Sequence, residues 1–197
     1  MSILSRLFFA SALLACAGCS SVYHLANQPN STELSQAQKA ALLAKKSAVP
    51  CRVDVICPSD MVGKYNTFFT SNVCHYPLEK ILEQAFSNAV YSSFEQPGGE
   101  ILDAFTLKVE VYKSQLLMSK TDATYTISLN ITLEEPGEKK VITFNEEKTN
   151  FIPIKGNVKT EVPEAVYEVV KEAAVSALNK IKTDPKAIKT IKRFEKK

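Results

Sequence analysis

The sequence predicts an α+β fold, a two-layer β-α-β-β-β-α sandwich with two helices packed on one face of a mostly antiparallel four-stranded sheet. Four segments alternate apolar and polar residues with the period of two that a half-buried strand requires, and two longer segments repeat apolar residues at helical spacing. Because each strand then has one apolar face and each helix one apolar stripe, the two layers can bury these surfaces against each other.

The first half of this domain contains one predicted strand and one predicted helix. Residues 51–57 alternate, and their apolar face is formed by Cys51, Val53, Val55 and Cys57. Residues 58–75 are expected to form a long loop. Residues 77–94 then repeat apolar residues at helical spacing, from Pro77, a favourable first helical residue, until the stretch Gln96-Pro97-Gly98-Gly99 ends the helix.

The second half contains three predicted strands and a second helix. The strands are residues 105–112, 124–133 and 140–150, with a hairpin turn at 135–138. The helix is expected to follow Pro163 and to stop at Asp184-Pro185. The first strand should lie parallel to its neighbour across a right-handed crossover, and which strand that neighbour is stays open.

The N-terminus has the layout of an export signal. Residues 1–18 contain one cation, Arg6, and an apolar core too short to span a bilayer, and the stretch 13–21 reads LLACAGCSS. This stretch resembles the lipobox of bacterial lipoproteins, in which the cysteine after small residues is diacylated. The resemblance implies lipidation of Cys19, with Cys16 as the alternative. Because Asp follows neither cysteine, the analogy with lipoprotein sorting implies the outer membrane, facing the periplasm.

The chain is expected to divide into four parts: a signal peptide (1–18), a lipidated tether with a short helix (19–48), a periplasmic domain (49–182) and a basic tail (183–197). The tail has a net charge of +4, because six Lys and Arg residues oppose Asp184 and Glu195. Apolar residues alternate with these cations. The tail is therefore either a surface for anionic lipid or lipopolysaccharide, or a frayed and solvated end.

Export to an oxidising compartment favours a disulfide. We prefer Cys57–Cys74, which would join both ends of the loop and contribute about 3 kcal/mol. Cys51–Cys74 is the alternative. No cysteine or histidine falls at metal-ligand spacing, so no metal is expected.

No catalytic constellation can be assembled from the sequence. The two histidines, His24 and His75, lie beside no nucleophile motif, and carboxylate pairs such as Glu146-Glu147 have the pattern of solvated strand ends. Phosphate-binding and dinucleotide motifs are absent from the sequence. We therefore expect no enzymatic activity, no cofactor and no nucleic-acid partner.

Besides the basic tail, two features are candidate contact surfaces. One is the polar, uncharged face of the third strand, formed by Thr124, Thr126, Ser128, Asn130 and Thr132. It is either a docking face for a partner or an ordinary solvated sheet face. The other is the aromatic loop 58–75, where Phe68 and Phe69 either bind a partner or cover one end of the core.

Two groups of Gram-negative envelope lipoproteins resemble this chain, the YajG-type family and the LptE lipoproteins of lipopolysaccharide assembly. The segments that carry the likeness are CRVDVIC, YPLEKILEQAFSNAV, FTLKVEVYKSQLLMS, DATYTISLNITL and PEAVYEVVKEAAVSAL. A third likeness, through VYHL at 22–25, is to auxiliary lipoproteins of ABC-type transport systems.

The resemblance implies a lipid-anchored accessory or assembly lipoprotein that binds a protein partner at the outer membrane. The alternative is a lipid- or lipopolysaccharide-binding auxiliary component of a transport system. In both, acyl chains on the N-terminal cysteine would attach the protein to the membrane.

Overall fold

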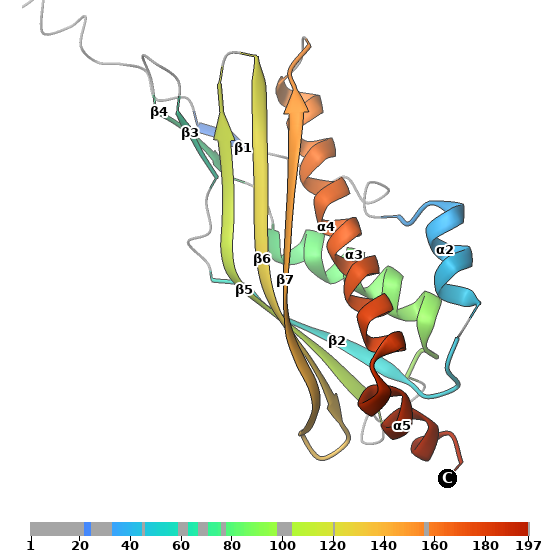
Figure 1. The fold of residues 1–197 in the computed structure, drawn as a ribbon. Helices are drawn as coiled ribbons and strands as arrows, with labels where there is room; N and C mark the ends of the chain where they lie inside the picture. Colours follow the sequence, from blue (N-terminus) through green and yellow to red (C-terminus); the bar gives the residue numbers. More distant parts are fainter. Residues whose placement is uncertain are drawn as a thin grey trace, which may run out of the picture.

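The computed structural model describes residues 22–24, 33–44, 46–58, 63–66, 71–75, 78–97, 104–119, 121–155 and 158–196. The α+β prediction is confirmed: the helices lie on one side of an open four-stranded sheet (Figure 1). The strands of this sheet, in spatial order, are β2 (Cys51–Ile56), β5 (Phe105–Met118), β6 (Asp122–Glu135) and β7 (Lys139–Pro153).

β2, the first strand of this sheet, pairs in parallel with β5, and Cys51 lies opposite Phe105. The two other pairings, β5–β6 and β6–β7, are antiparallel. The predicted hairpin turn joins β6 to β7, and Gly137 has a φ of +89° there, a left-handed conformation that glycine adopts without steric cost.

A second, three-stranded sheet was not predicted. It has the order β1-β4-β3 and consists of β1 (Val22–His24), β3 (Gly63–Asn66) and β4 (Ser71–His75), with β3 lying against β5 (Figure 1). The loop prediction for residues 58–75 is wrong for β3 and β4, which both lie within that range. β1 lies in the segment that was predicted to be the tether. Strands of three to five residues are too short to show a clear alternation, and their pairing partners are far away in sequence.

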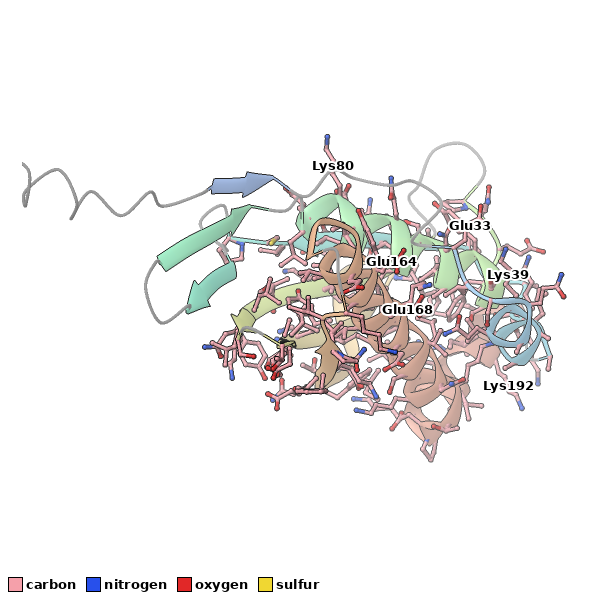
Figure 2. The ribbon with its side chains drawn as sticks, turned by 90° about the horizontal axis from the view of Figure 1, so that it is seen from above. Glu33, Lys39, Lys80, Glu164, Glu168 and Lys192 are labelled. Atoms are coloured by element: carbon pink, nitrogen blue, oxygen red, sulfur yellow. The ribbon has the colours of Figure 1, made fainter. Side chains whose placement is uncertain are left out.

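The helix layer begins with α2 (Gln36–Leu43) and α3 (Leu78–Ser93), both at predicted positions. Ser35 caps α2 in a capping box with Gln38. Leu42 of α2 is fully buried, so this short helix packs into the core instead of standing ahead of the domain. Charged side chains lie on the outside of the layer, as Figure 2 shows for Lys39 on α2 and Lys80 on α3.

Helix α4 (Val158–Thr183) begins five residues before Pro163, where the sequence placed its start. The backbone N–H of Lys155 donates to the Glu161 carboxylate at 3.0 Å, a contact that holds the chain entering this first part of the helix. The predicted break at Asp184-Pro185 is confirmed. Asp184 caps the following helix, α5 (Pro185–Phe194), by accepting a hydrogen bond from the Ala187 N–H at 2.8 Å.

The core lies between the helices and one face of the sheet. The helix-facing residues of β6 have no exposed surface, and they are Ala123, Tyr125, Ile127, Leu129, Ile131 and Leu133. They pack in one cluster with buried residues of α3 and α4 such as Phe86 and Val166. Burial of an apolar side chain of this size contributes roughly 1.5–3 kcal/mol, so this face provides the main driving force for folding.

One carboxylate lies between the sheet and the helices. Glu146 of β7 is only 3% exposed. It accepts a hydrogen bond from the Lys180 ammonium group of α4 at 2.5 Å, and it forms an ion pair with Lys148 at 3.5 Å. The expectation that Glu146 and Glu147 are both solvated is therefore wrong for Glu146, because alternation along β7 turns it toward α4. The ion pair connects the last strand to the last long helix.

The basic tail is a docked helix and not a frayed end. Ala187 is fully buried and Ile191 is 8% exposed, and both belong to the main core cluster. The Phe194 ring meets the Phe105 ring edge to face at 5.1 Å between centroids. Arg193 also forms a salt bridge with Glu135 at the β6–β7 hairpin. The apolar residues that alternate with the cations are thus the docking face of α5.

Cys51 is a free thiol buried in the core at the start of β2. Its removal from water raises the pKa of this thiol from 9.0 to about 12, opposed in part by a hydrogen bond with the Leu107 backbone. The alternative Cys51–Cys74 bond is therefore not formed, because Cys51 points into the sheet–helix core. The Cys57–Cys74 bond stays a prediction, since the Cys74 side chain lies outside the described residues.

Removal of the α5 contact should weaken the whole domain. We expect Ile191→Ala to lower the free energy of unfolding by about 2 kcal/mol, because it leaves a cavity beneath the helix. Urea unfolding followed by circular dichroism measures this change. Lys189→Ala in the same helix removes an exposed side chain and should change it by less than about 0.5 kcal/mol. Equal effects of both substitutions would contradict the docked position of α5.

Cys51 should resist alkylation in the folded protein. Its thiol is inaccessible, and its raised pKa keeps the reactive thiolate scarce until the pH approaches about 12. By linkage, the neutral thiol stabilises the fold fully below pH 9.0, and this contribution is lost as the pH rises toward 12. Maleimide labelling at mildly alkaline pH, read by peptide mass spectrometry, should modify Cys51 only after urea is added.

The same labelling tests the predicted bridge. If Cys57 and Cys74 are joined, both become reactive after a reductant is added, whereas Cys51 stays protected under either condition. Modification of Cys51 in the folded, reduced protein would contradict its buried position.

Candidate functional site

The face of the sheet opposite the helices is the candidate site. Thr124, Thr126, Ser128, Asn130 and Thr132 all lie on it, because they alternate along β6 with the buried core residues. The other predicted contact residues, Phe68 and Phe69, lie outside the described residues, as do the lipidation candidates Cys16 and Cys19. Of the strand face and the aromatic loop, the structure therefore describes only the strand face.

Most of the polar side chains on the open face of β6 are hydrogen-bonded to side chains of the neighbouring strands. Ser128 is fully buried and Thr132 is 3% exposed, although both face away from the helices. Four of the five make side-chain hydrogen bonds across the sheet: Thr126 with Thr149 at 3.0 Å, Ser128 to Glu147 at 2.7 Å, Asn130 to Glu110 at 2.8 Å, and Thr132 with Thr143 at 3.2 Å. This polar ladder stabilises strand pairing. It leaves these groups little capacity to recognise a partner.

Large apolar side chains flank the polar ladder. Among the described residues, six large apolar side chains are exposed, and four of them lie on this face: Ile56 at 45%, Tyr112 at 55%, Leu117 at 43% and Phe151 at 62%. Leu117 and Phe151 stand on either side of Thr124 in the strand register. Tyr112 sits at a register shift between Val111 and Lys113, so two consecutive residues of β5 are exposed there. We call these four residues the apolar patch.

The sequence contains a signal for the apolar patch. Ile56 and Tyr112 occupy the polar positions of their alternating strands, where an apolar residue has no core to enter. Leu117 and Phe151 were missed because the predicted strands ended at 112 and 150, whereas β5 and β7 extend to Met118 and Pro153.

The other end of the same face is charged. Near the β6–β7 hairpin, the sheet forms an open hollow of about 960 Å³ with both signs of charge on its walls, including Arg52, Asp54, Lys108, Glu134 and Lys140. One of these charges is paired, since Lys108 lies 3.7 Å from Glu110, and Arg52 donates a hydrogen bond to the neutral Thr106 hydroxyl at 2.9 Å. Exposed pairs of this kind contribute at most about 1 kcal/mol each. The hollow therefore has no strong preference for one sign of ligand.

The histidines come together in a way that the sequence does not indicate. In the parallel pairing of β1 with β4, His24 lies opposite His75 in the backbone register. Within the described ranges, no group of three or more His, Cys, Asp or Glu side chains could hold a metal ion. Among the helices that the structure describes, none is long and apolar enough to cross a membrane.

Comparison with known proteins identifies relatives of the fold only. Neither a protein-family model nor a curated protein matches the chain. A Xanthomonas campestris protein of the family DUF330 has a similar structure, with a TM-score of 0.50 and 13% identity over 80% of this chain and 92% of that one.

Two further structures are more distant. A candidate lipoprotein of Caulobacter crescentus has a TM-score of 0.45 and 11% identity over 80% of this chain and 97% of that one. A minor lipoprotein of Acinetobacter baumannii has a TM-score of 0.41 and 15% identity over 68% and 91%. At these identities the comparisons establish that this chain and the Xanthomonas protein share a fold.

Proposed function

We propose that this protein is a lipid-anchored lipoprotein of the Gram-negative envelope, held at the outer membrane and facing the periplasm. It acts by binding a protein partner through the open face of the sheet and not by catalysis. The observation that carries the proposal is the apolar patch: Ile56, Tyr112, Leu117 and Phe151 are between 43% and 62% exposed on one face. The lipobox-like stretch at 13–21 supports the anchor.

The chemistry of the patch suits protein recognition. Aromatic side chains are enriched at the centres of protein interfaces, because each provides a large contact area for little loss of conformational freedom. Tyr112 and Phe151 are aromatic residues of this kind, and Leu117 extends the surface beside Phe151 across Thr124. Because the polar ladder is already hydrogen-bonded internally, a partner that covers it leaves few groups without partners.

Membrane attachment allows such an interface to be small. Anchoring both partners to one surface raises their effective concentration, so that a weak contact is sufficient. Single myristoyl-like chains bind membranes only marginally, whereas several acyl chains at about 0.8 kcal/mol per buried methylene hold a protein stably. A diacylated cysteine would give this attachment.

Loss of the acylated cysteine should release the protein. We expect Cys19→Ala to move it from the membrane fraction to the soluble fraction of a cell lysate, and Cys16→Ala to leave it on the membrane. If Cys16 is the acylated residue, the two outcomes are exchanged. Immunoblots of both fractions, with mass spectrometry of the N-terminal peptide, measure this. Retention of the double variant on membranes washed with high salt would contradict the anchor.

The patch can be tested by site-specific crosslinking in cells. A photo-reactive phenylalanine analogue at position 151 should crosslink one discrete protein, whereas the same analogue at position 91 should not. Tyr91 is 36% exposed on α3 and thus serves as the matched control on the helix layer.

A second substitution shows whether that crosslink reports the proposed interface. Tyr112→Ala should lower the crosslinking yield at 151 by about fivefold, since it removes an aromatic anchor of an exposed patch without loss of core packing. Equal yields from positions 151 and 91, or no effect of Tyr112→Ala, would contradict docking at the open face.

A further inference from the structure

The main sheet has one long edge that no other described strand covers. At its other edge, β2 begins beside the segment after α3, because the Cys51 N–H donates to the Glu95 carbonyl at 3.2 Å. β5, which is longer than β2, also has β3 of the small sheet against it. β7 is the last strand on the opposite side (Figure 1), and within the described ranges no strand pairs with its outer edge. Such an edge is a template for another strand, and native proteins usually protect it.

Every second residue of β7 points its backbone N–H and C=O groups toward this edge. In an antiparallel pair these groups point alternately toward the partner strand and away from it. The Ile154 N–H donates to the Thr121 carbonyl at 2.8 Å, and the register with β6 continues from there without a shift to Ile142, so the even-numbered residues bond to β6. The backbone groups of Glu147, Thr149 and Phe151 therefore point outward, and all three residues are exposed.

The usual protections of an edge strand are found in the first half of β7. There the Lys180 ammonium group of α4 donates to the outward-pointing Asn145 carbonyl at 3.4 Å, and a register shift interrupts the pairing with β6. In the second half, the charged side chains are engaged within the sheet. The Glu147 carboxylate accepts a hydrogen bond from β6, and Lys148 forms an ion pair within β7. Residues 147–151 therefore present an open edge.

A hollow on the helix side adjoins this edge. Its volume is about 430 Å³, and its mostly polar lining includes Lys148 of β7 and Glu172, Ser176 and Asn179 of α4, the helix that packs against β7. A strand added at the edge would place alternate side chains in this hollow and the others beside Phe151 on the open face. Because the hollow is polar and the patch is apolar, the edge fits an extended segment in which polar and apolar residues alternate.

We propose that the edge of β7 from Glu147 to Phe151 binds an extended segment of the partner protein by strand addition. The inference rests on the proposed function and states how the partner engages the apolar patch. The outward N–H and C=O groups of Glu147, Thr149 and Phe151 bond to the backbone of the segment. Its apolar side chains contact Phe151, and its polar side chains enter the hollow. Because Phe151 belongs to both the edge and the patch, the two surfaces form one continuous interface.

Two substitutions at one position test the backbone contact. Thr149→Pro removes an N–H that points away from β6, and proline is tolerated at such edge positions. Thr149→Val removes the same hydroxyl but keeps the N–H. With the photo-reactive phenylalanine analogue at position 151, we expect Thr149→Pro to lower the crosslinking yield about tenfold and Thr149→Val by less than about twofold. Both purified variants should have similar urea midpoints, since the proline removes no hydrogen bond of the fold.

A second crosslinking position tests the path of the segment and does not depend on the proline variant. Asn179 is exposed on α4 and lines the hollow on the helix side, whereas Phe151 lies on the open face. The analogue at position 179 should crosslink the same protein as at position 151, because the segment follows the edge between the two faces. Position 91 on α3 again serves as the control and should give no product.

The outcomes separate this inference from the proposed function. A discrete crosslink at position 151 that Thr149→Pro does not weaken, or that has no counterpart at position 179, overturns strand addition and leaves the partner interface standing. A product that contains only peptides of this chain, at twice its mass, identifies a second copy as the occupant and also overturns the proposal. Absence of any discrete product at position 151 contradicts the proposed interface itself, and strand addition with it.

Discussion

Burial of one face of a single sheet beneath α3 and α4 is the constraint on which the rest of this structure depends. The helix-facing row of β6 is fully buried, and it lies at the centre of the sheet between β5 and β7. A sheet with helices on only one side must keep its opposite face compatible with water. The polar ladder meets that requirement by pairing its own hydroxyl, amide and carboxylate groups across the strands.

Because one face of the sheet is buried and the other is polar, exposed apolar residues on the polar face indicate a candidate contact surface. On a face that is otherwise polar and internally bonded, Tyr112 and Phe151 have no structural task, and exposing them gains nothing for folding. Their exposure on this face is the observation on which the proposed partner interface rests. The helix layer shows a contrasting solution, since Glu146 is polar but is turned inward and held by Lys180.

The docked helix α5 covers one end of the sheet. With α5 docked, the Phe105–Phe194 contact and the Arg193–Glu135 pair close the end of the sheet where β5 begins and the β6–β7 hairpin turns. A segment that reads as a basic tail is thus part of the core, and its cations remain on the solvent side.

The sequence by itself determined the features whose energetics are local. Alternation in β2, β5, β6 and β7 showed which residues face the core, turn chemistry located the β6–β7 hairpin, and Asp184-Pro185 located the break between α4 and α5. Only the tertiary structure decided the rest: the parallel neighbour of β2, the short β1-β4-β3 sheet, the docking of α5 and the position of β7 at the edge of the sheet. These depend on contacts between residues far apart in the chain, and the free energy of such contacts is set by packing and desolvation that no local pattern records.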